Sequence, residues 1–422
     1  MGRRPVGWTA TMVVIFLADI LVWSDRTNFS VAAAVWRRQL HWTPAVLGAL
    51  FSAFSLGYLV LQPLGGWMSD RLGTRRTLAA ACGGWSVSVL LVPWAPSALW
   101  LTGFLRTLLG LFEAPFFPAA TAAVARAVPE RHRRGRYSGL INSGASLGPA
   151  LGTILAALIA KNLGVVWIFL LFGGAGVLLA GGWWLYAARR ADPAPGDSAG
   201  TSEALERADE PAASLGRILA LPSIGALLLA YFSVPYCLML FSTWLPVYFT
   251  RYRHFSLVQA GILSALPFLA ACFGSIGAGL FSDCLARRGW TWDGLHRKLP
   301  VFLGAVTYIG AILVAAVIPA ASWAAAMIVA ANLGLSFITG QYWTIVSDIT
   351  ARQAGTVSGW MNFCGGLGAL AAPLTTGYLV AATGSFTLPF RVAAAVMAGG
   401  TLLLILLVRV RPLGRLLATG GG

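Results

Sequence analysis

Charged residues are scarce in this chain. They make up 10% of its 422 residues, whereas 58% are apolar and the mean hydropathy is +0.75. Soluble domains carry about 25% charged residues, so this composition excludes water as the solvent of most of the surface. The sequence therefore predicts a polytopic membrane protein.

Cysteine and histidine are also few, and neither is spaced for chemistry. The five cysteines and four histidines show no metal-ligand pattern and no Cys/His pairing, and no Ser/His arrangement stands out in the apolar runs. We therefore expect a protein that is not an enzyme and has no metal site or organic cofactor. The residues concerned are Cys82, Cys237, Cys272, Cys284, Cys364, His41, His132, His254 and His296.

Long apolar runs fill most of the sequence. A helix needs about 20 apolar residues to cross the hydrocarbon core, and twelve runs qualify. We expect an all-α membrane protein with twelve transmembrane helices in two six-helix bundles. The first six run over Trp8–Val35, Ala45–Met68, Thr77–Pro93, Leu99–Val124, Tyr137–Ala160 and Val165–Ala188. The second six run over Pro222–Tyr248, Leu257–Phe281, Leu299–Ile318, Trp323–Val346, Gly355–Ala382 and Phe386–Val408.

A polar segment separates the two sets of spans. The stretch from Asp192 to Pro211 is rich in Pro, Gly, Ser and acidic residues, a composition typical of a flexible linker. A small regulatory module is the alternative, but the stretch has too few apolar residues to form a core. The predicted organisation is a bundle over 1–190, a cytoplasmic linker over 191–216 and a bundle over 217–422.

The net charge of +16 reports topology rather than nucleic-acid binding, because the arginines gather in alternate loops. Loops rich in Arg and Lys face the cytoplasm, so both termini are expected inside. The first span is too long for a cleaved signal peptide, and the pattern fits a bacterial inner membrane. These cations include Arg3, Arg4, Arg131, Arg133, Arg134, Arg136, Arg287, Arg288, Arg297, Lys298, Arg409, Arg411 and Arg415.

One motif occurs twice. The loop Gly66–Arg76 has a degraded copy at Gly279–Arg288, offset by 213 positions, and Gly48 and Gly261 keep the same offset. Each half is therefore expected to hold the same helical layout. The first copy is predicted to act as a cytoplasmic latch in gating, and simple anchoring of the cytoplasmic face is the alternative. Its gating residues are Gly66, Asp70, Arg71, Gly73, Arg75 and Arg76.

Five charged residues lie inside the first and fourth spans: Asp19, Asp25, Arg26, Arg106 and Glu113. An insertion scale assigns about 2.5 to 3.5 kcal/mol to Asp or Arg at mid-bilayer, so these side chains need partners or a water-filled cavity. Arg106 and Glu113 are seven residues apart, as are Asp19 and Arg26, so each pair shares a helix face within about 20°. A purely structural ion network is the alternative. Against it, the second half has nothing comparable before Asp348 and Arg391, near span ends.

These residues and motifs resemble the major facilitator superfamily. The loop has the form Gly-x-x-x-Asp-Arg-x-Gly-x-Arg-Arg, and Asp25-Arg26-Thr27-Asn28, the run from Arg106 to Pro118 and Asn142-Ser143-Gly144 resemble the anion:cation symporter branch. That resemblance implies proton-coupled symport of sugar acids or other organic anions. Ala145 stands where hexuronate-type carriers have a glutamine, which leaves small and aromatic carboxylates open.

Charge counting leads to the same mechanism. Three acids and two arginines sum to minus one when ionised, so an anionic substrate makes the site more negative unless protons accompany it. We assign Arg26 to the substrate carboxylate, because its planar fork matches one. Asp25 and Glu113 are the expected proton carriers, and Arg106 holds the acids ionised when substrate is absent. The proton gradient then takes the place of a cofactor.

Polar-tipped and aromatic residues in other spans complete the predicted substrate site, although core packing is a competing interpretation for each aromatic residue. Together with Arg26 the predicted substrate-binding residues are Trp23, Asn142, Tyr236, Gln341, Trp343, Thr344 and Asn362. The expected partners are a small organic anion, protons and the bilayer, and the chain is expected to act as a monomer.

A glycine pattern in the fifth span favours a different function. Gly144-x3-Gly148-Pro149-x2-Gly152 resembles a pattern of drug:proton antiporters in the same superfamily, and tight helix packing is its commoner use. The adjacent Asp25 and Arg26 favour anion uptake over export of drugs or metabolites. A non-transporting receptor has no support, because the linker is too short for a signalling domain.

Overall fold

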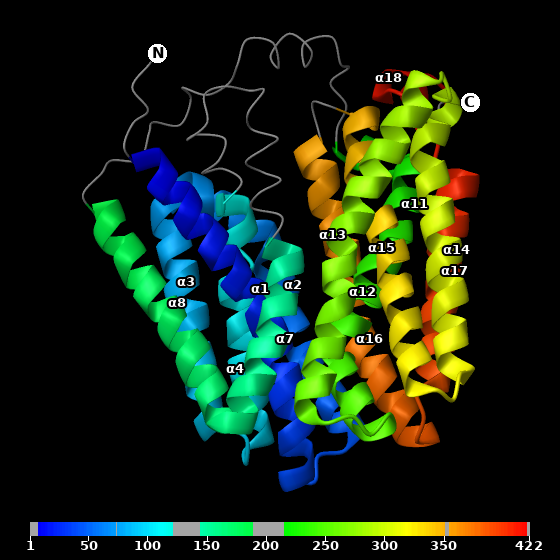
Figure 1. Cartoon of the computed structure of the whole chain (residues 1–422). Helices are drawn as coiled ribbons and strands as arrows, with labels where there is room; N and C mark the ends of the chain where they lie inside the picture. The colour runs from blue at the N-terminus through cyan, green and yellow to red at the C-terminus, as the bar shows by residue number, and fades with distance from the viewer. Residues whose placement is uncertain (1–6, 73, 121–143, 189–214, 351–353, 420–422) are drawn as a thin grey trace. The chain divides into compact units, whose positions relative to one another are not determined.

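The computed structural model describes residues 7–72, 74–120, 144–188, 215–350 and 354–419, and every regular element in these ranges is a helix (Figure 1). The long helices before residue 189 are α1 (Gly7–Gln39), α2 (Pro44–Leu72), α3 (Thr74–Leu91), α4 (Leu99–Glu113), α7 (Gly144–Asn162) and α8 (Val165–Ala188). Those after residue 214 are α11 (Pro222–Tyr231), α12 (Ser233–Val247), α13 (Leu257–Arg287), α14 (Leu295–Val317), α15 (Ala321–Ile349), α16 (Ala354–Thr383) and α17 (Thr387–Leu407). Short pieces are η1 (Val92–Trp94), α10 (Leu215–Leu219), η2 (Tyr248–Tyr252), η3 (Trp292–Gly294) and α18 (Leu413–Thr419).

The predicted spans coincide with these helices. The predicted sixth span and α8 have the same bounds, and most other ends differ by a few residues. Within the described ranges, 10 helices are long and apolar enough to cross a membrane. The charged α1 and the 15-residue α4 are not among them. The all-helical fold is confirmed, while the count of twelve stays a prediction. The predicted linker lies almost entirely outside the described residues.

The prediction of loops at the two motif copies is wrong. α2 remains helical through Leu72, and α13 continues to Arg287. The polar residues of these stretches do not by themselves stop a helix, since they end an apolar run without breaking the backbone ladder. The chain leaves the helical conformation of α13 at Gly289, whose φ of +79° is a left-handed conformation that glycine adopts freely.

The internal repeat is visible in the helix boundaries. Pro44 and Leu257, the first residues of α2 and α13, are 213 positions apart, which is the offset of the motif copies. Gly48 and Gly261 are the fifth residues of these helices. The two halves therefore do share a helical layout at this point.

The chain forms two compact units. Unit 1 comprises Met1–Ser198 with Phe241–Leu266, and unit 2 comprises Ala199–Leu240 with Pro267–Gly422. In unit 1, α1 packs along α7, α2 along α4 and α3 along α8. In unit 2, α14 packs against α15 and α17, and α11 against α16 and α17. α12 and α13 are each divided between the units, with one part of the helix in unit 1 and the other part in unit 2. The predicted boundaries at 190 and 217 stay a prediction.

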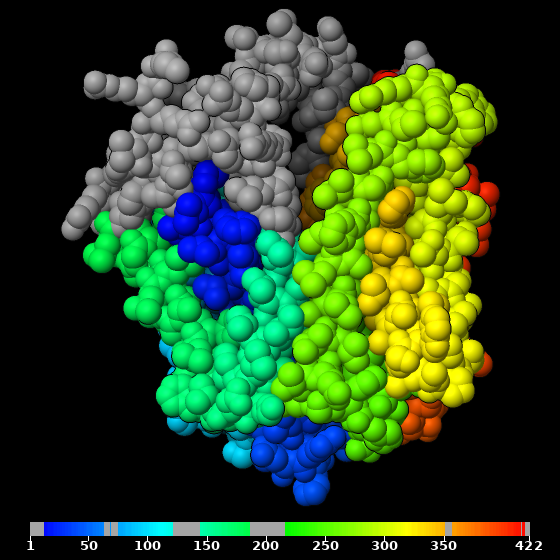
Figure 2. All heavy atoms as spheres, in the orientation of Figure 1, coloured from blue at the N-terminus to red at the C-terminus, as the bar shows by residue number. Residues whose placement is uncertain are grey.

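Apolar side chains cover the outside of unit 2. On α13, Leu269, Phe273, Ile276 and Leu280 are exposed at helical spacing, and this helix and α14 lie open on the face seen in Figure 2. Phe273 is 74% exposed. A continuous apolar stripe suits a hydrocarbon solvent.

Glycines bring α2 and α4 into contact along their backbones. A Cβ atom on Gly57 would overlap the carbonyl oxygen of Thr107, and one on Gly110 would overlap that of Phe54. Small residues permit such an approach where no hydrophobic effect drives helices together. Gly110 lies one turn from both Arg106 and Glu113, so this contact fixes the charged part of α4 against α2.

We expect Gly110→Ala to lower the thermal stability of the purified protein, because the added methyl has to push α2 away from α4. Steric overpacking of this kind costs about 1 to 3 kcal/mol. The measurement is the unfolding temperature in detergent. Gly182→Ala is the matched control, since a Cβ atom there meets nothing within 4 Å. Equal unfolding temperatures for the two variants would contradict the close packing.

Candidate functional site

A buried ion pair joins α1 and α4 within unit 1. Arg26 Nε donates to Glu113 Oε2 at 3.1 Å, and the side chain of Glu113 is completely buried. Two helices therefore bring together one basic and one acidic group that the sequence placed 87 positions apart. Charge-assisted hydrogen bonds of this kind are about twice as strong as neutral ones.

Aromatic rings surround the Arg26 guanidinium. Its Cζ lies 4.1 Å from the centroid of Trp23, 5.0 Å from Tyr58 and 5.1 Å from Phe54. Ring faces are negative, so each ring attracts the cation, by about 0.5 to 2 kcal/mol per contact. α2 thus contributes two rings to a site whose charges come from α1 and α4.

Arg106 lies in a second aromatic environment. Its Cζ is 4.5 Å from the centroid of Phe29 and 5.3 Å from Phe54, and its Nε donates to the carbonyl oxygen of Leu50 at 3.5 Å. Phe54 contacts both arginines. The side chain of Arg106 is fully buried, so the two guanidinium groups belong to one buried cluster.

Asp25 is buried beside them on α1 and accepts a hydrogen bond from Asn28 Nδ2 at 3.3 Å. Asn28 is one turn further along the same helix. A neutral amide rather than a cation is the hydrogen-bonding partner of this carboxyl group. Within the described residues it forms no salt bridge, so Asp25 can take up a proton there without breaking one.

Asp19 is the most isolated acid of the set. It is 0% exposed, and within the described residues neither of its carboxyl oxygens has a hydrogen-bond partner. Its Oδ2 lies directly against the backbone of α7, where a Cβ atom on Gly144 would overlap it. A buried acceptor without a donor costs about 1 to 3 kcal/mol, so a structural role alone does not account for Asp19.

The glycines of α7 serve close packing. A Cβ atom on Gly148 would contact Trp23 and Ile20, and one on Gly152 would contact Ser24. Ser24 Oγ also donates to the carbonyl oxygen of Gly148 at 2.8 Å. The pattern that resembles drug antiporters thus has a packing function here, the commoner use of small residues.

Several polar atoms of the cluster have open hydrogen-bonding capacity. Arg26 Nη2 and Trp23 Nε1 are buried donors, and Glu113 Oε1 is a buried acceptor, all without a partner in the described part of the chain. Native proteins leave few such groups unpaired. The cluster is therefore able to bind a ligand that has both hydrogen-bond acceptors and donors, with an acidic group suited to Arg26.

The predicted residues of the second half lie in unit 2. Tyr236 is buried, with its hydroxyl 2.7 Å from Thr375 Oγ1, while Asn362 is half-buried on α16. Trp343 is 37% exposed, and its ring meets Tyr231 edge-on at 6.0 Å. These residues come from α12, α15 and α16.

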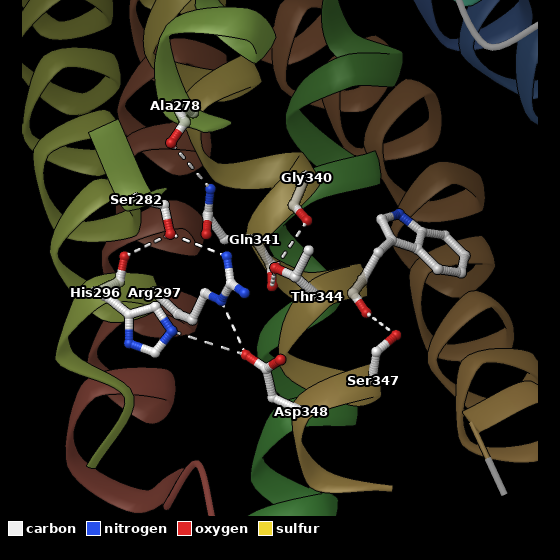
Figure 3. A network of polar contacts seen from close by, with 10 residues as sticks. Ala278, Ser282, His296, Arg297, Gly340, Gln341, Thr344, Ser347 and Asp348 are labelled. Atoms are coloured by element: carbon white, nitrogen blue, oxygen red, sulfur yellow. Dashed lines mark hydrogen bonds and ion pairs between the residues drawn. The ribbon is translucent and has the colours of Figure 1, made fainter. Parts of the chain in front are cut away.

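Gln341 and Thr344 make backbone hydrogen bonds on α15. Gln341 Nε2 donates to Ala278 of α13 at 3.4 Å, while Thr344 Oγ1 donates to the carbonyl oxygen of Gln341 at 2.9 Å (Figure 3). Gln341 Oε1 is buried and has no partner in the described residues. The amide thus ties two helices together and keeps one acceptor open.

A further polar network lies close to the second motif copy. Arg297 Nε donates to Asp348 Oδ2 at 2.9 Å, and its Nη1 donates to Ser282 Oγ at 3.0 Å, which joins α13, α14 and α15 (Figure 3). Asp348 is exposed. Exposed ion pairs contribute about 0 to 1 kcal/mol, so this network orients helix ends more than it stabilises them.

Some predicted residues cannot be placed in the site. Asn142 and Gly73 lie outside the described residues. Gly66, Asp70 and Arg71 belong to the last turns of α2, whose side chains are not described. Arg75 is half-buried and Arg76 exposed on α3, and the carbonyl oxygen of Arg75 accepts a hydrogen bond from Trp183 Nε1 at 2.9 Å. The gating role of this motif stays a prediction.

Sequence reasoning missed the aromatic part of the site. Tyr58 and Phe54 on α2 and Phe29 on α1 all face an arginine. One signal was available: Phe54 and Tyr58 are four residues apart, so they share a helix face, and Tyr58 is a polar-tipped residue in an apolar run. Nothing in the sequence indicated that this face turns toward Arg26.

Comparison with known proteins agrees with this geometry. Residues 15–373 match the sequence profile of the Major Facilitator Superfamily. The chain belongs to the Major Facilitator Superfamily. It is accordingly a multi-pass membrane transporter and not an enzyme, as the sequence predicted.

Its relatives in the Major Facilitator Superfamily include named anion transporters. The chain is 31% identical to a D-galactonate transporter of Escherichia coli O6:H1, over 98% of both chains. It is also 31% identical to a probable sulfoacetate transporter of Cupriavidus necator, over 92% of this chain and 91% of that one. A hexuronate transporter of Bacillus subtilis is 27% identical over 94% of both. The predicted resemblance to carriers of sugar acids and other anions is confirmed.

The fold is also similar to that of a solved structure. A bacterial homologue of the human lysosomal transporter Spinster, in an inward-facing and occupied conformation, superposes with a TM-score of 0.74. It is 18% identical in sequence, over 99% of this chain and 96% of that one. At this identity the likeness supports the fold alone.

The buried ion pair predicts how stability responds to substitution. Arg26→Gln leaves the Glu113 carboxylate buried without its cation, and breaking a buried pair costs about 3 to 5 kcal/mol. The double variant Arg26→Gln/Glu113→Gln removes both charges of this pair, so we expect it to unfold at a higher temperature than Arg26→Gln.

The difference should shrink at mildly acidic pH, because a protonated Glu113 does not need a cation. Thermal unfolding in detergent across a pH series measures both effects. An equal or lower unfolding temperature for the double variant would show that an unpaired Glu113 carboxylate does not destabilise the fold.

Proposed function

We propose that the chain takes up a small organic anion together with protons, by alternating access. The substrate class is a carboxylate such as a hexuronate or an aldonate. The Arg26–Glu113 contact is the observation that carries this proposal. It is supported by relatives that are named as transporters of D-galactonate, hexuronate and sulfoacetate.

Binding and protonation compete for the same guanidinium. A substrate carboxylate needs the fork of Arg26, and in the structure one nitrogen of that fork is bound to Glu113 while Nη2 is open. Protonation of Glu113 weakens the existing pair and frees Arg26 for the substrate. Protonation of Asp25, whose partner is Asn28, offsets the added negative charge.

The remaining cation completes the coupling. Arg106 lies in the same cluster, over Phe29 and Phe54, and favours the ionised acids when substrate is absent. By thermodynamic linkage, protons raise the affinity for the anion by the same factor that the anion raises the affinity for protons. Inward proton flow then drives accumulation.

A contact inside unit 1 is suited to closing one end of the transport path. Ser30 Oγ donates to the carbonyl oxygen of Thr243, and Phe51 packs edge-on against Trp244 with 5.4 Å between ring centroids. The segment Phe241–Leu266 belongs to α12, η2 and α13. In alternating access one set of helices rocks against the other, so opening of this end requires these contacts to separate.

The transporter is proposed to reside in a bacterial inner membrane with both termini in the cytoplasm and to work as a monomer. The proton gradient is the proposed energy source. The placement of the cationic loops supports this orientation.

The proposal is tested by uptake into proteoliposomes with an acidic outside and a neutral inside. We expect accumulation of D-galactonate or a hexuronate, and loss of binding in Arg26→Ala. Glu113→Gln should lose accumulation driven by the pH gradient, because this position can no longer exchange a proton. Gly182→Ala is the control for handling and insertion.

Uphill, pH-dependent accumulation by Glu113→Gln would contradict the assigned coupling residue. Movement of a lipophilic cation against protons, with no transport of any acid by the unsubstituted protein, would favour the drug or metabolite antiporter.

The gating motif yields a separate prediction. Asp70→Asn should slow transport at least several-fold while membrane levels stay normal, because the latch loses the charge that would face a helix end or basic neighbours. Initial uptake rates divided by the amount of inserted protein measure this effect. Unchanged rates would reduce the motif to an anchor of the cytoplasmic face.

A further inference from the structure

Asp19, Trp23 and Arg26 form a row along one face of α1. Positions 19 and 26 lie within about 20° of one direction, and position 23 about 40° to the other side of position 19. The row extends for roughly 10 Å along the helix axis. Arg26 at one end is the carboxylate-binding group of the proposed function, on which this inference rests.

At the other end of the row the Asp19 carboxyl group and the Trp23 indole lie near each other but form no well-directed hydrogen bond. Both carboxyl oxygens of Asp19 and the Nε1 atom of Trp23 are buried and lack a hydrogen-bond partner in the described residues. Asp19 also has no cation within 4 Å among them. The backbone of Gly144 fixes the carboxyl group from the side of α7.

We propose that Asp19 is a specificity residue that binds the hydroxyl groups of a polyhydroxy monocarboxylate whose acid end lies on Arg26. A hydroxyl group donates and accepts at once, so a chain of hydroxyls satisfies the Asp19 carboxyl and the Trp23 indole together. An ammonium group has no acceptor and would leave the indole unpaired. An unhydroxylated acid would leave both groups unpaired.

The charges of the cluster also favour a hydroxylated monocarboxylate. Asp19, Asp25 and Glu113 exceed Arg26 and Arg106 by one negative charge when all are ionised. A dianion without hydroxyls, such as sulfoacetate, adds two more negative charges to this set, whereas a sugar acid adds one. Asp19 therefore favours the long, hydroxylated monoanion and disfavours the short dianion.

The test is calorimetric titration of the purified full chain with D-galactonate and with sulfoacetate, for the unsubstituted protein, Asp19→Ala and Asp19→Asn. We expect Asp19→Ala to weaken D-galactonate binding about tenfold or more, because sites that hydrogen-bond substrate hydroxyls lose strongly when the pairing is removed. Sulfoacetate binding should stay equal or become tighter. Asp19→Asn should fall between, since its amide oxygen still accepts.

Leu17→Ala is the matched control on the same helix, because Leu17 is 45% exposed and points away from the cluster. Asp19→Asn keeps the side-chain volume, and a thermal unfolding scan checks that each variant is folded.

Three results would overturn the inference. One is unchanged D-galactonate affinity in both Asp19 variants. Another is a parallel loss for both ligands. The third is an unchanged affinity ratio with a changed number of protons carried per anion, which would make Asp19 a proton carrier instead.

If the unsubstituted protein binds sulfoacetate but not D-galactonate, organic-anion transport stands and the role of Asp19 falls. If it binds no organic acid at all, the proposed function itself fails.

Discussion

Burying five ionisable side chains in an apolar helix bundle is the constraint on which unit 1 depends. In hydrocarbon a charge needs a partner, and side chains on different helices reach each other only if the helices approach closely. Gly57 and Gly110 let the backbones of α2 and α4 touch. That approach places Phe54 and Tyr58 on the guanidinium of Arg26 and places Glu113 within hydrogen-bond distance of it.

Compensation within the cluster is incomplete, and this has a functional consequence. Arg26 uses Nε for Glu113 and keeps Nη2 open, while Glu113 keeps Oε1 open. A fully satisfied pair would have only a structural role, because no ligand group could improve on its hydrogen bonds. A half-satisfied pair can exchange one partner for another at small cost, which is what a carrier requires of a group that binds and releases substrate in every cycle.

Much of the fold could be predicted from the sequence, because the bilayer sets helix length and apolar runs of that length are easy to recognise. α8 begins and ends where its apolar run does. The loop predicted at Gly66–Arg76 is instead mostly helix, since polarity marks the membrane edge and not the end of a backbone ladder. The charged residues of the site could also be chosen from sequence, because charge in an apolar span is conspicuous.

The pairing of those charges could not be predicted. Which face of α4 turns toward α1 depends on the packing at Gly110 and on ring contacts from α2, and the helical spacing of one sequence segment contains neither. Tyr58 was missed for the same reason: its spacing from Phe54 identifies a face but not what the face meets. The contact between Asn28 and Asp25 was easier to predict, because the two residues are one turn apart on the same helix.

The repeat helps to decide what the charges are for. At the offset of 213, Asp25 and Arg26 correspond to Leu238 and Met239, and Ser30 corresponds to Thr243, the residue it contacts. The second copy of the layout thus folds with apolar side chains where the first copy has an acid and a base. If ion pairs were needed to pack this arrangement of helices, both copies would need them. Because only the first copy has an acid and a base at these positions, packing does not explain their cost, and the proposed binding of a charged substrate does.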